Sequence, residues 1–341
     1  MGAIWIKRNH LIGNTGEVVG YKSGLGLTLE EFNDIIPYPY HPYWFGESES
    51  FIRIRAEEYE EMIAHLLHKL GNIESPNIPF ISSKYLKIKD KDSEIFNIFL
   101  DLFSLFSDFL KNEIEEFKKD KLKSNKINPT PFIELGHNKY GIKGRMVAID
   151  ILEQYTLKQH VSPWGKIRMT NWVDVAELKG LFESESLNTF YGKFIDQRYI
   201  DYLSHNFDSI NEINWRKFEA LTCEFFHKNG YYVEIGEGRD DDGIDARIWS
   251  KEENKTDPPA ILVQCKRYRS KIEKMVVKSL YADVLEYGAQ SGLIVTTSSL
   301  SPGAEKTCIA RKYPIEQANR ESLKKWIENM RSPYTGIFMS E

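Results

Sequence analysis

The chain has 341 residues and 41% of them are hydrophobic, which is enough for two domains of ordinary size with their own cores. The formal net charge of -5 excludes a protein that coats nucleic acid through overall positive charge, so any contact with DNA must come from a local basic patch. Cys223, Cys265 and Cys308 form neither a CxxC pair nor a zinc-binding cluster, which indicates reduced thiols and a cytoplasmic location. The opening MGAIWIKRNH lacks the apolar core of a secretory signal, so we expect no export.

Residues 1–205 are predicted to form the first domain, and helical patterns dominate them. Apolar side chains recur at helical spacing in AEEYEEMIAHLLHKLG (56–71), which predicts a helix that ends at Gly71. A second helix is predicted to begin with Ser93 as its N-cap and to stop at Asn128-Pro129. From 131 to 200 we expect shorter elements, and no motif there indicates a chemistry. We therefore predict an α+β, helix-rich domain of unassigned fold that recognises the target, binds a partner protein or forms oligomers.

The second of these helices contains a Phe-rich segment, IFNIFLDLFSLFSDFL (95–110), that resembles a membrane span in composition. A span needs about 20 mostly apolar residues, and a carboxylate near its centre costs roughly 2.5 to 3.5 kcal/mol. This segment is shorter and carries Asp101 and Asp108. We therefore predict a buried helix or an interface between subunits, and no membrane partner.

Residues 206–341 are predicted to form the second domain, in which helices and strands follow one another closely. The expected elements are a helix at 215–229, strands at 231–236, 243–249 and 260–268, a helix at 272–287, a strand at 292–297, a helix from 301, a strand at 314–317 and a helix through Trp326. Gly230 is expected to end the first helix in the left-handed conformation. This alternation predicts an α/β fold.

Four side chains of this domain form a candidate catalytic group. Asp245 begins one predicted strand, Gln264 and Lys266 lie on the next, and Glu219 lies on the preceding helix. Residues at i and i+2 of a strand share a face, so Gln264 and Lys266 are expected to point together while Cys265 faces the core. A lysine on a buried strand is unusual, because lysine is almost never fully buried unless it is paired.

This group fits metal-dependent hydrolysis of a phosphodiester. That reaction needs a divalent cation, held by hard oxygen ligands, to polarise the phosphate and activate water. Asp245, Glu219 and the backbone carbonyl of Cys265 are the predicted ligands of Mg²⁺, which Mn²⁺ can replace. Lys266 is expected to orient the water or to offset negative charge in the transition state.

The order W-x-x-FE-x-L, GYYVEIGEGRDDDGID, VQCKRY and GLIVTTSSLSPGA, from about Trp215 to Trp326, resembles Mrr-type restriction endonucleases, a branch of the PD-(D/E)xK nuclease superfamily, in the QxK variant. The resemblance implies an αβββαβ core with a central mixed sheet. It also implies that Asp245 binds metal, that Gln264 and Lys266 are the QxK residues, and that Glu219 is the helix glutamate.

Two features depart from that pattern or leave it open. The family commonly has two glycines where this chain has Asp242-Gly243, which leaves an acidic approach, 240–242, that fits a solvated loop or a second metal site. Glu224 is an alternative helix carboxylate. It lies five residues beyond Glu219, about 140° around a helix, so both cannot point into one site. The motif match favours Glu219.

The segment KRYRSKIEKMVVK (266–278) concentrates positive charge after the strand that carries the QxK residues. It fits either a patch that neutralises DNA phosphates or the charged start of a helix. The candidate DNA-binding residues are Lys266, Arg267, Arg269, Lys271, Lys274 and Lys278. The polar run 296–299 fits either donors to DNA phosphate or the cap of the next helix. His205 and His227 are expected to be ordinary polar residues.

The leading hypothesis is a Mg²⁺-dependent DNA endonuclease that restricts foreign or modified DNA, as in defence against phages. The first domain would then recognise modified DNA or a protein partner. Cutting both strands with one site per chain favours a homo-oligomer. A junction resolvase with the same site, and a noncatalytic module for DNA binding or assembly, are the alternatives. Preference for four-way junctions would favour the former, and intact Asp245, Gln264 and Lys266 argue against the latter.

Overall fold

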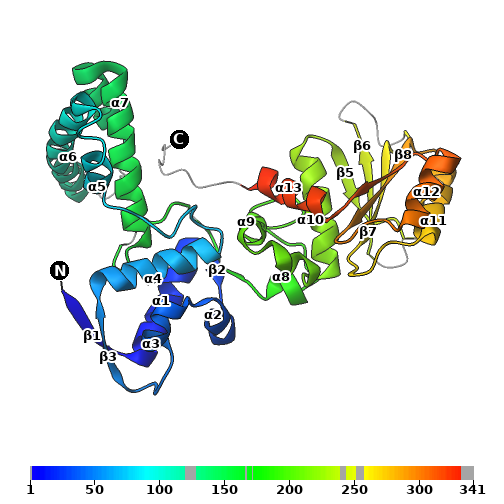
Figure 1. Ribbon diagram of the computed structural model, residues 1–341, viewed down its shortest axis with the longest axis horizontal. Helices are drawn as coiled ribbons and strands as arrows, with labels where there is room; N and C mark the ends of the chain where they lie inside the picture. The colour runs from blue at the N-terminus through cyan, green and yellow to red at the C-terminus, as the bar shows by residue number, and fades with distance from the viewer. Residues whose placement is uncertain are drawn as a thin grey trace.

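The computed structural model describes residues 2–119, 128–165, 167–170, 172–238, 243–250 and 257–331. A helix-rich N-terminal part and a sheet-containing C-terminal part lie at opposite ends of an elongated molecule (Figure 1). None of the helices described is long and apolar enough to cross a membrane.

The N-terminal part begins with two helices packed beside a small β-ribbon. Strands β1 and β3 pair antiparallel, with Ile4 opposite Ile54, and their isoleucines pack on helices α1 and α4. The elements are β1 (Ala3–Lys7), α1 (Arg8–Ser23), β2 (Leu25–Gly26), α2 (Leu29–Ile35), η1 (Tyr38–Tyr40), α3 (His41–Trp44), β3 (Phe51–Arg55) and α4 (Ala56–Lys69). The predicted helix that ends at Gly71 is confirmed, and Gly71 itself has a left-handed φ of 73°.

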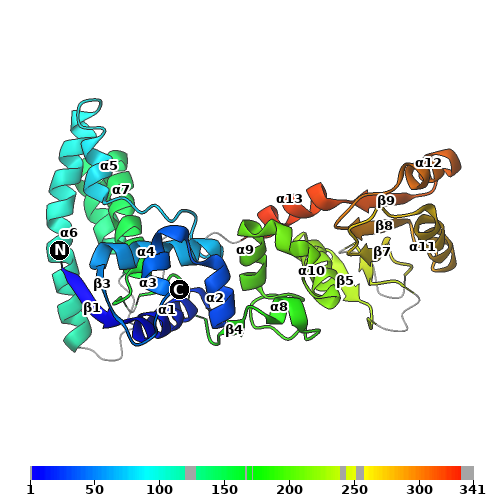
Figure 2. The ribbon, with the colours of Figure 1, turned by 60° about the horizontal axis from the view of Figure 1, so that its bottom comes forward.

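A helical hairpin stands away from this unit, at the end of the molecule far from the large sheet (Figure 2). It consists of α5 (Ile81–Leu86), α6 (Ser93–Lys119) and α7 (Thr130–Val161). The buried side of α6 includes Phe99, Leu102 and Phe106, which pack with Phe132 and Ile151 in a separate core. The Phe-rich segment is therefore a largely buried helix, although Phe103 on its other side stays 45% exposed.

One prediction for this hairpin is wrong, and another is correct only in part. The N-cap of α6 is Asp92, whose carboxylate accepts a hydrogen bond from the Ile95 N–H at 3.0 Å. Aspartate caps as well as serine does, and its charge suits the positive end of the helix dipole. The predicted shorter elements are present only in part: Gly141, with a non-helical φ of 61°, divides α7 into two helices, whereas Gly136 and Gly144 do not interrupt them. Gly136 and Gly144 lie where the two halves of α7 meet, too close for a Cβ atom.

The C-terminal part contains a five-stranded mixed sheet in the order β5-β6-β7-β8-β9. The first three strands are antiparallel and the last three are parallel. Helices α10 and α13 cover one face, and α11 and α12 cover the other (Figure 1). The elements are α10 (Trp215–Lys228), β5 (Tyr232–Ile235), β6 (Ala246–Trp249), β7 (Ile261–Lys266), α11 (Lys274–Glu286), β8 (Ser291–Thr296), α12 (Pro302–Arg311), β9 (Ile315–Ala318) and α13 (Arg320–Met330). The predicted α/β fold and mixed sheet are confirmed.

Short elements join the two parts: β4 (Ala176–Glu177), α8 (Gly180–Glu183), α9 (Gln197–His205) and η2 (Phe207–Asn211). Strand β4 pairs in parallel with β2 of the N-terminal part. One buried apolar cluster extends from Leu11 and Leu66 through Leu203 to Phe218 and Val263. Helix α9 contacts both α4 of the N-terminal part and α13 of the C-terminal part, and α10 starts beside the segment that joins them.

Candidate active site

Asp245 lies one residue before β6, where regular pairing with β7 ends. Its backbone continues the pairing of β6 with both neighbouring strands. Its N–H donates to the Val263 carbonyl of β7 at 2.9 Å, and its carbonyl accepts from the N–H of Gly236, just after β5, at 2.8 Å. Its side chain accepts a hydrogen bond from the Cys265 N–H at 2.6 Å. The neighbouring Ile244 is fully buried in the core under α11. Asp245 is thus held firmly, with its carboxylate against the β7 backbone.

Glu219 of α10 meets this carboxylate from the helix side. Its side chain is 6% exposed and accepts a hydrogen bond from the Arg216 guanidinium at 2.8 Å. Burial raises the pKa of Glu219 to about 8, and the neighbouring Asp245, which lies within hydrogen-bonding reach, contributes to the rise. Two carboxyl groups that share a buried position cannot both ionise cheaply. The pair therefore favours a shared proton or a bound cation.

Gln264 and Lys266 occupy alternate positions of β7, on the opposite face from Cys265. The Cys265 thiol lies 3.6 Å from the Thr222 hydroxyl of α10, so Cys265 faces that helix as predicted. The Gln264 amide nitrogen donates to the Gly243 carbonyl at 3.0 Å, and its buried Oε1 has no hydrogen-bond partner among the described residues. The Lys266 side chain is half-buried, and its ammonium has no hydrogen bond or ion pair within the same residues. The Asp245 carboxylate contacts the N–H of Cys265, the residue between Gln264 and Lys266 on β7.

The structure separates the two helix carboxylates that the sequence left as alternatives. Glu224 is also buried, but it points to the loop before α9. Its carboxylate accepts hydrogen bonds from the backbone N–H groups of Lys193 at 2.9 Å and Phe194 at 2.7 Å. Glu224 thus anchors the segment that joins the two parts, while Glu219 lies beside Asp245.

Arg216 is a residue of the site that the sequence analysis missed. One of its guanidinium nitrogens donates to Glu219 and another donates to the Gly236 carbonyl at 2.6 Å. Arg216 therefore ties the start of α10 to the end of β5. Its spacing of three residues before Glu219 is the signal that could have identified it, because side chains at i and i+3 of a helix are neighbours.

The residues present fit a divalent cation. Asp245 and Glu219 supply carboxylate oxygens side by side, the Cys265 peptide is adjacent, and the Gln264 Oε1 is an unused buried acceptor. Hard oxygen donors of this kind suit Mg²⁺ or Mn²⁺. No cluster of three or more His, Cys, Asp or Glu that could hold a metal was found in the described ranges. The acidic approach, 240–242, lies outside those ranges.

The predicted basic patch surrounds the end of β7 and the start of α11. Two of its arginines already have partners, since Arg267 donates to the Asn211 carbonyl at 2.6 Å and Arg269 lies 4.0 Å from Glu212. Lys271 and Lys274 are exposed, and no hydrogen bond or ion pair engages either of them in the part of the chain that the structure describes. These two lysines are therefore the side chains most available to DNA phosphates.

Two threonines of the polar run 296–299 form hydrogen bonds within the protein, and His205 is partly buried. Thr296 accepts a hydrogen bond from the Ser298 N–H at 3.1 Å, and the Thr297 hydroxyl donates to the Tyr268 carbonyl at 3.0 Å. The cap of α12 is Ser301, whose hydroxyl accepts from Ala304 at 3.3 Å. Burial lowers the pKa of His205 to about 4, which makes that residue a poor base at neutral pH.

Comparison with known proteins identifies the C-terminal part. Residues 210–327 match the restriction endonuclease family defined by the Mrr catalytic domain. This part of the chain is an Mrr-type nuclease domain. Asp245, Glu219, Gln264 and Lys266 all lie within the matched segment.

No curated protein matches the chain. Among solved structures, the MspJI restriction endonuclease in complex with a 27-mer oligonucleotide is similar at 17% identity and a TM-score of 0.29. That alignment covers 59% of this chain and 42% of that one, so the chain spans less than half of that enzyme. A likeness of this size carries no conclusion about the fold or the ligand of this protein.

Proposed function

We propose that the protein is a Mg²⁺-dependent endodeoxyribonuclease of the cytoplasm that restricts foreign or modified DNA. The observation that carries the proposal is the buried Asp245–Glu219 carboxyl pair beside Gln264 and Lys266, inside a segment that matches restriction endonucleases. Neighbouring buried carboxyl groups, one of which has a raised pKa, are typical of functional sites.

Each residue has a specific proposed role. Asp245, Glu219 and the Cys265 carbonyl hold the cation, and Gln264 completes the set through its amide oxygen. When bound there, a divalent cation polarises the scissile phosphate and lowers the pKa of the attacking water. Lys266 places a positive charge where negative charge develops in the transition state. Arg216 positions Glu219 by holding its carboxylate.

The remaining parts of the proposal concern binding and assembly. Lys271, Lys274 and Lys278, together with Lys266, Arg267 and Arg269, neutralise the DNA backbone next to the site. The N-terminal residues recognise the modified target or a partner protein. Two copies act together, because one site per chain cuts one strand at a time.

The test compares catalysis with binding in purified protein. Asp245→Ala and Lys266→Ala should cut DNA at least about a hundredfold more slowly, because losing one preorganised electrostatic group costs about 10² to 10³ in rate. Both proteins should still bind DNA, since most phosphate contacts remain. The substrates are modified and unmodified phage and plasmid DNA with Mg²⁺. Full cutting by both variants would refute the proposed site, and equal cutting of all substrates would refute the proposed role in restriction.

A further inference from the structure

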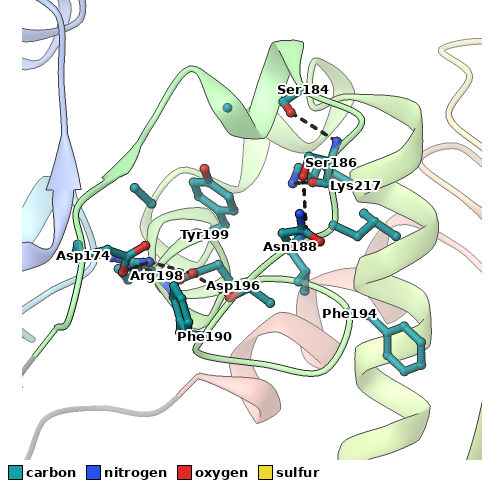
Figure 3. A pocket seen from close by; sticks show the side chains of 15 residues that line it. Asp174, Ser184, Ser186, Asn188, Phe190, Phe194, Asp196, Arg198, Tyr199 and Lys217 are labelled. Atoms are coloured by element: carbon teal, nitrogen blue, oxygen red, sulfur yellow. Dashed lines mark hydrogen bonds and ion pairs between the residues drawn. The ribbon is translucent and has the colours of Figure 1, made fainter.

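A second site lies where the joining segment meets the start of α10. A cavity of about 580 Å³ is bounded by β4 and α8, by the loop 184–190, by the start of α9 and by Lys217 of α10. Figure 3 shows Ser184, Ser186, Asn188 and Lys217 on one side of it and the group Asp174, Arg198 and Asp196 on the other, with Tyr199 between them. Small-molecule sites have volumes of roughly 300 to 1,000 Å³.

Lys217 is the charged side chain of this cavity that has no direct ion pair among the described residues. It is 6% exposed, and its ammonium donates to the Ser186 carbonyl and lies 5.6 Å from the centre of the Tyr199 ring. Within the described ranges, no carboxylate lies within ion-pair distance of its Nζ. A lysine ammonium has three donors, and one hydrogen bond leaves two of them unused. Lysine is almost never buried in this way without a negative partner.

The other charged side chains of the cavity, Arg198, Asp196 and Asp174, form one ion-paired group. Arg198 donates to both oxygens of Asp196, at 2.8 and 2.7 Å, and to Asp174 at 3.1 Å. It also donates to the Gly24 carbonyl at 2.9 Å. The Thr189 hydroxyl binds the same Asp196 carboxylate at 2.7 Å. The Asp196 carboxylate is thus engaged by Arg198 and acts on Lys217 only at longer range, where it partly offsets the lowering of the lysine pKa by burial. The guanidinium is not available to a ligand.

We propose that this cavity binds a phosphate ester of mononucleotide size, with its phosphate at Lys217 and its ring at Phe190. A carboxylate ligand is best matched by an arginine fork, whereas lysine binds phosphate as a point charge. The Ser184 and Ser186 hydroxyls accept backbone N–H groups at 3.2 and 3.4 Å, so their own hydrogens remain to be donated.

Phe190 supports the choice of a ligand that carries an aromatic ring. It lines the cavity and its side chain is 76% exposed, so the ring is accessible to a ligand. Stacking of a base on an aromatic side chain contributes about 1 to 3 kcal/mol. Phe190 and Lys217 line the same cavity, so one ligand can carry both a phosphate and a ring. This site goes beyond the proposed nuclease function, because it shares no residue with the carboxylate site.

Calorimetric titration of the full chain with AMP, inorganic phosphate and adenosine tests the proposal. EDTA is present throughout to remove divalent cations. Without a cation, the carboxylates of the nuclease site repel anions and do not compete for AMP. AMP should bind most tightly, inorganic phosphate more weakly, and adenosine weakest. Lys217→Met should weaken AMP binding at least about tenfold, since a hydrogen bond to a charged group contributes roughly 1.5 to 3 kcal/mol. Lys193→Met, at an exposed lysine beside the cavity, is the matched control and should change the affinity for AMP by less than about twofold.

Two further variants keep the test decisive. Phe190→Ala alters an exposed side chain that the fold does not need. It should weaken the binding of AMP without changing the binding of inorganic phosphate, and it remains a test even if Lys217→Met fails to fold. Lys266→Ala should leave AMP binding intact, which separates this cavity from the nuclease site. Equal affinity of wild-type protein and Lys217→Met for AMP, or no binding of AMP to wild-type protein, would overturn the proposal.

Discussion

Glu219→Gln is the substitution whose effect on stability the structure predicts most directly. The folded-state pKa of Glu219 is about 8, against an ordinary value of 4.5, because the carboxyl is buried and lies beside Asp245. Between these two pH values the folded protein keeps a proton that the unfolded chain releases. Stability of the metal-free protein must therefore fall as pH rises from about 4.5 to about 8, and then level off. Glutamine has the same shape and does not ionise, so the variant loses this dependence.

The size of the effect follows from the width of that window. Each pH unit between the two pKa values changes the free energy of unfolding by about 1.4 kcal/mol, so the full window corresponds to at most about 5 kcal/mol. The hydrogen bond from Arg216 to Glu219 at 2.8 Å can be kept, because the glutamine carbonyl also accepts. We therefore expect Glu219→Gln to be more stable than wild-type protein at pH 8 in EDTA, by a few kcal/mol, while the difference shrinks toward pH 5.

Urea unfolding in EDTA from pH 5 to pH 9 measures this difference. Glu224→Gln is the matched control. Its carboxylate is satisfied by backbone N–H groups of Lys193 and Phe194, so losing the charge should destabilise the protein by about 1 to 3 kcal/mol. Mg²⁺ should raise the stability of wild-type protein at pH 8, by about 2.7 kcal/mol at a hundred times its Kd, and should have less effect on Glu219→Gln.

Parallel stability curves for wild-type protein and Glu219→Gln would show that Glu219 ionises normally and that the carboxyl pair is not coupled. A Mg²⁺ effect of equal size in both proteins would place the cation elsewhere. Either result would remove Glu219 from the proposed ligand set without affecting the family match of residues 210–327.

Three other predictions follow from the same structure. DNA cleavage should require Mg²⁺ or Mn²⁺ and should stop in EDTA or with Ca²⁺, as a digestion series will show, and activity in EDTA would exclude the metal site. Lys274→Ala should weaken DNA binding on all sequences and reduce the slope of log K against log salt by about one phosphate contact, measured by fluorescence anisotropy. Phe106→Ala should cost about 3 to 5 kcal/mol in urea unfolding, because the ring is 5% exposed and packs on Phe132 at 5.0 Å, whereas Phe103→Ala should cost far less.

The elements of the nuclease domain could be predicted because each has a local signal. The strands β7 and β8 are short apolar runs bounded by turn residues, and α10 has a periodic apolar face that ends at Gly230, which adopts a φ of 88°. The alternation of β7 also predicted which side chains face α10, since strand geometry fixes that pattern. Local chemistry and the tertiary fold agree along this segment.

The features that could not be predicted depend on contacts between distant segments. Three glycines in 130–161 look alike in sequence, yet only Gly141 turns the chain, while Gly136 and Gly144 allow two helices to approach. The cavity at Lys217 is formed by the joining segment and α10 together, so neither stretch shows it alone. A lysine in the first turn of a helix gives no sign that it will be buried.

The two glutamates of α10 show why burial alone does not identify a functional carboxylate. Glu219 is 6% exposed and Glu224 is 2% exposed, so a ranking by burial would choose Glu224 over Glu219, the carboxylate that we propose for the site. Their partners distinguish them. Glu224 is surrounded by backbone N–H donors, which satisfy a negative charge completely and leave it nothing further to bind. Glu219 has one guanidinium and a second carboxyl beside it, so its charge is satisfied only when a proton or a cation joins the pair. The carboxylate that the fold leaves incompletely satisfied is the one available for catalysis.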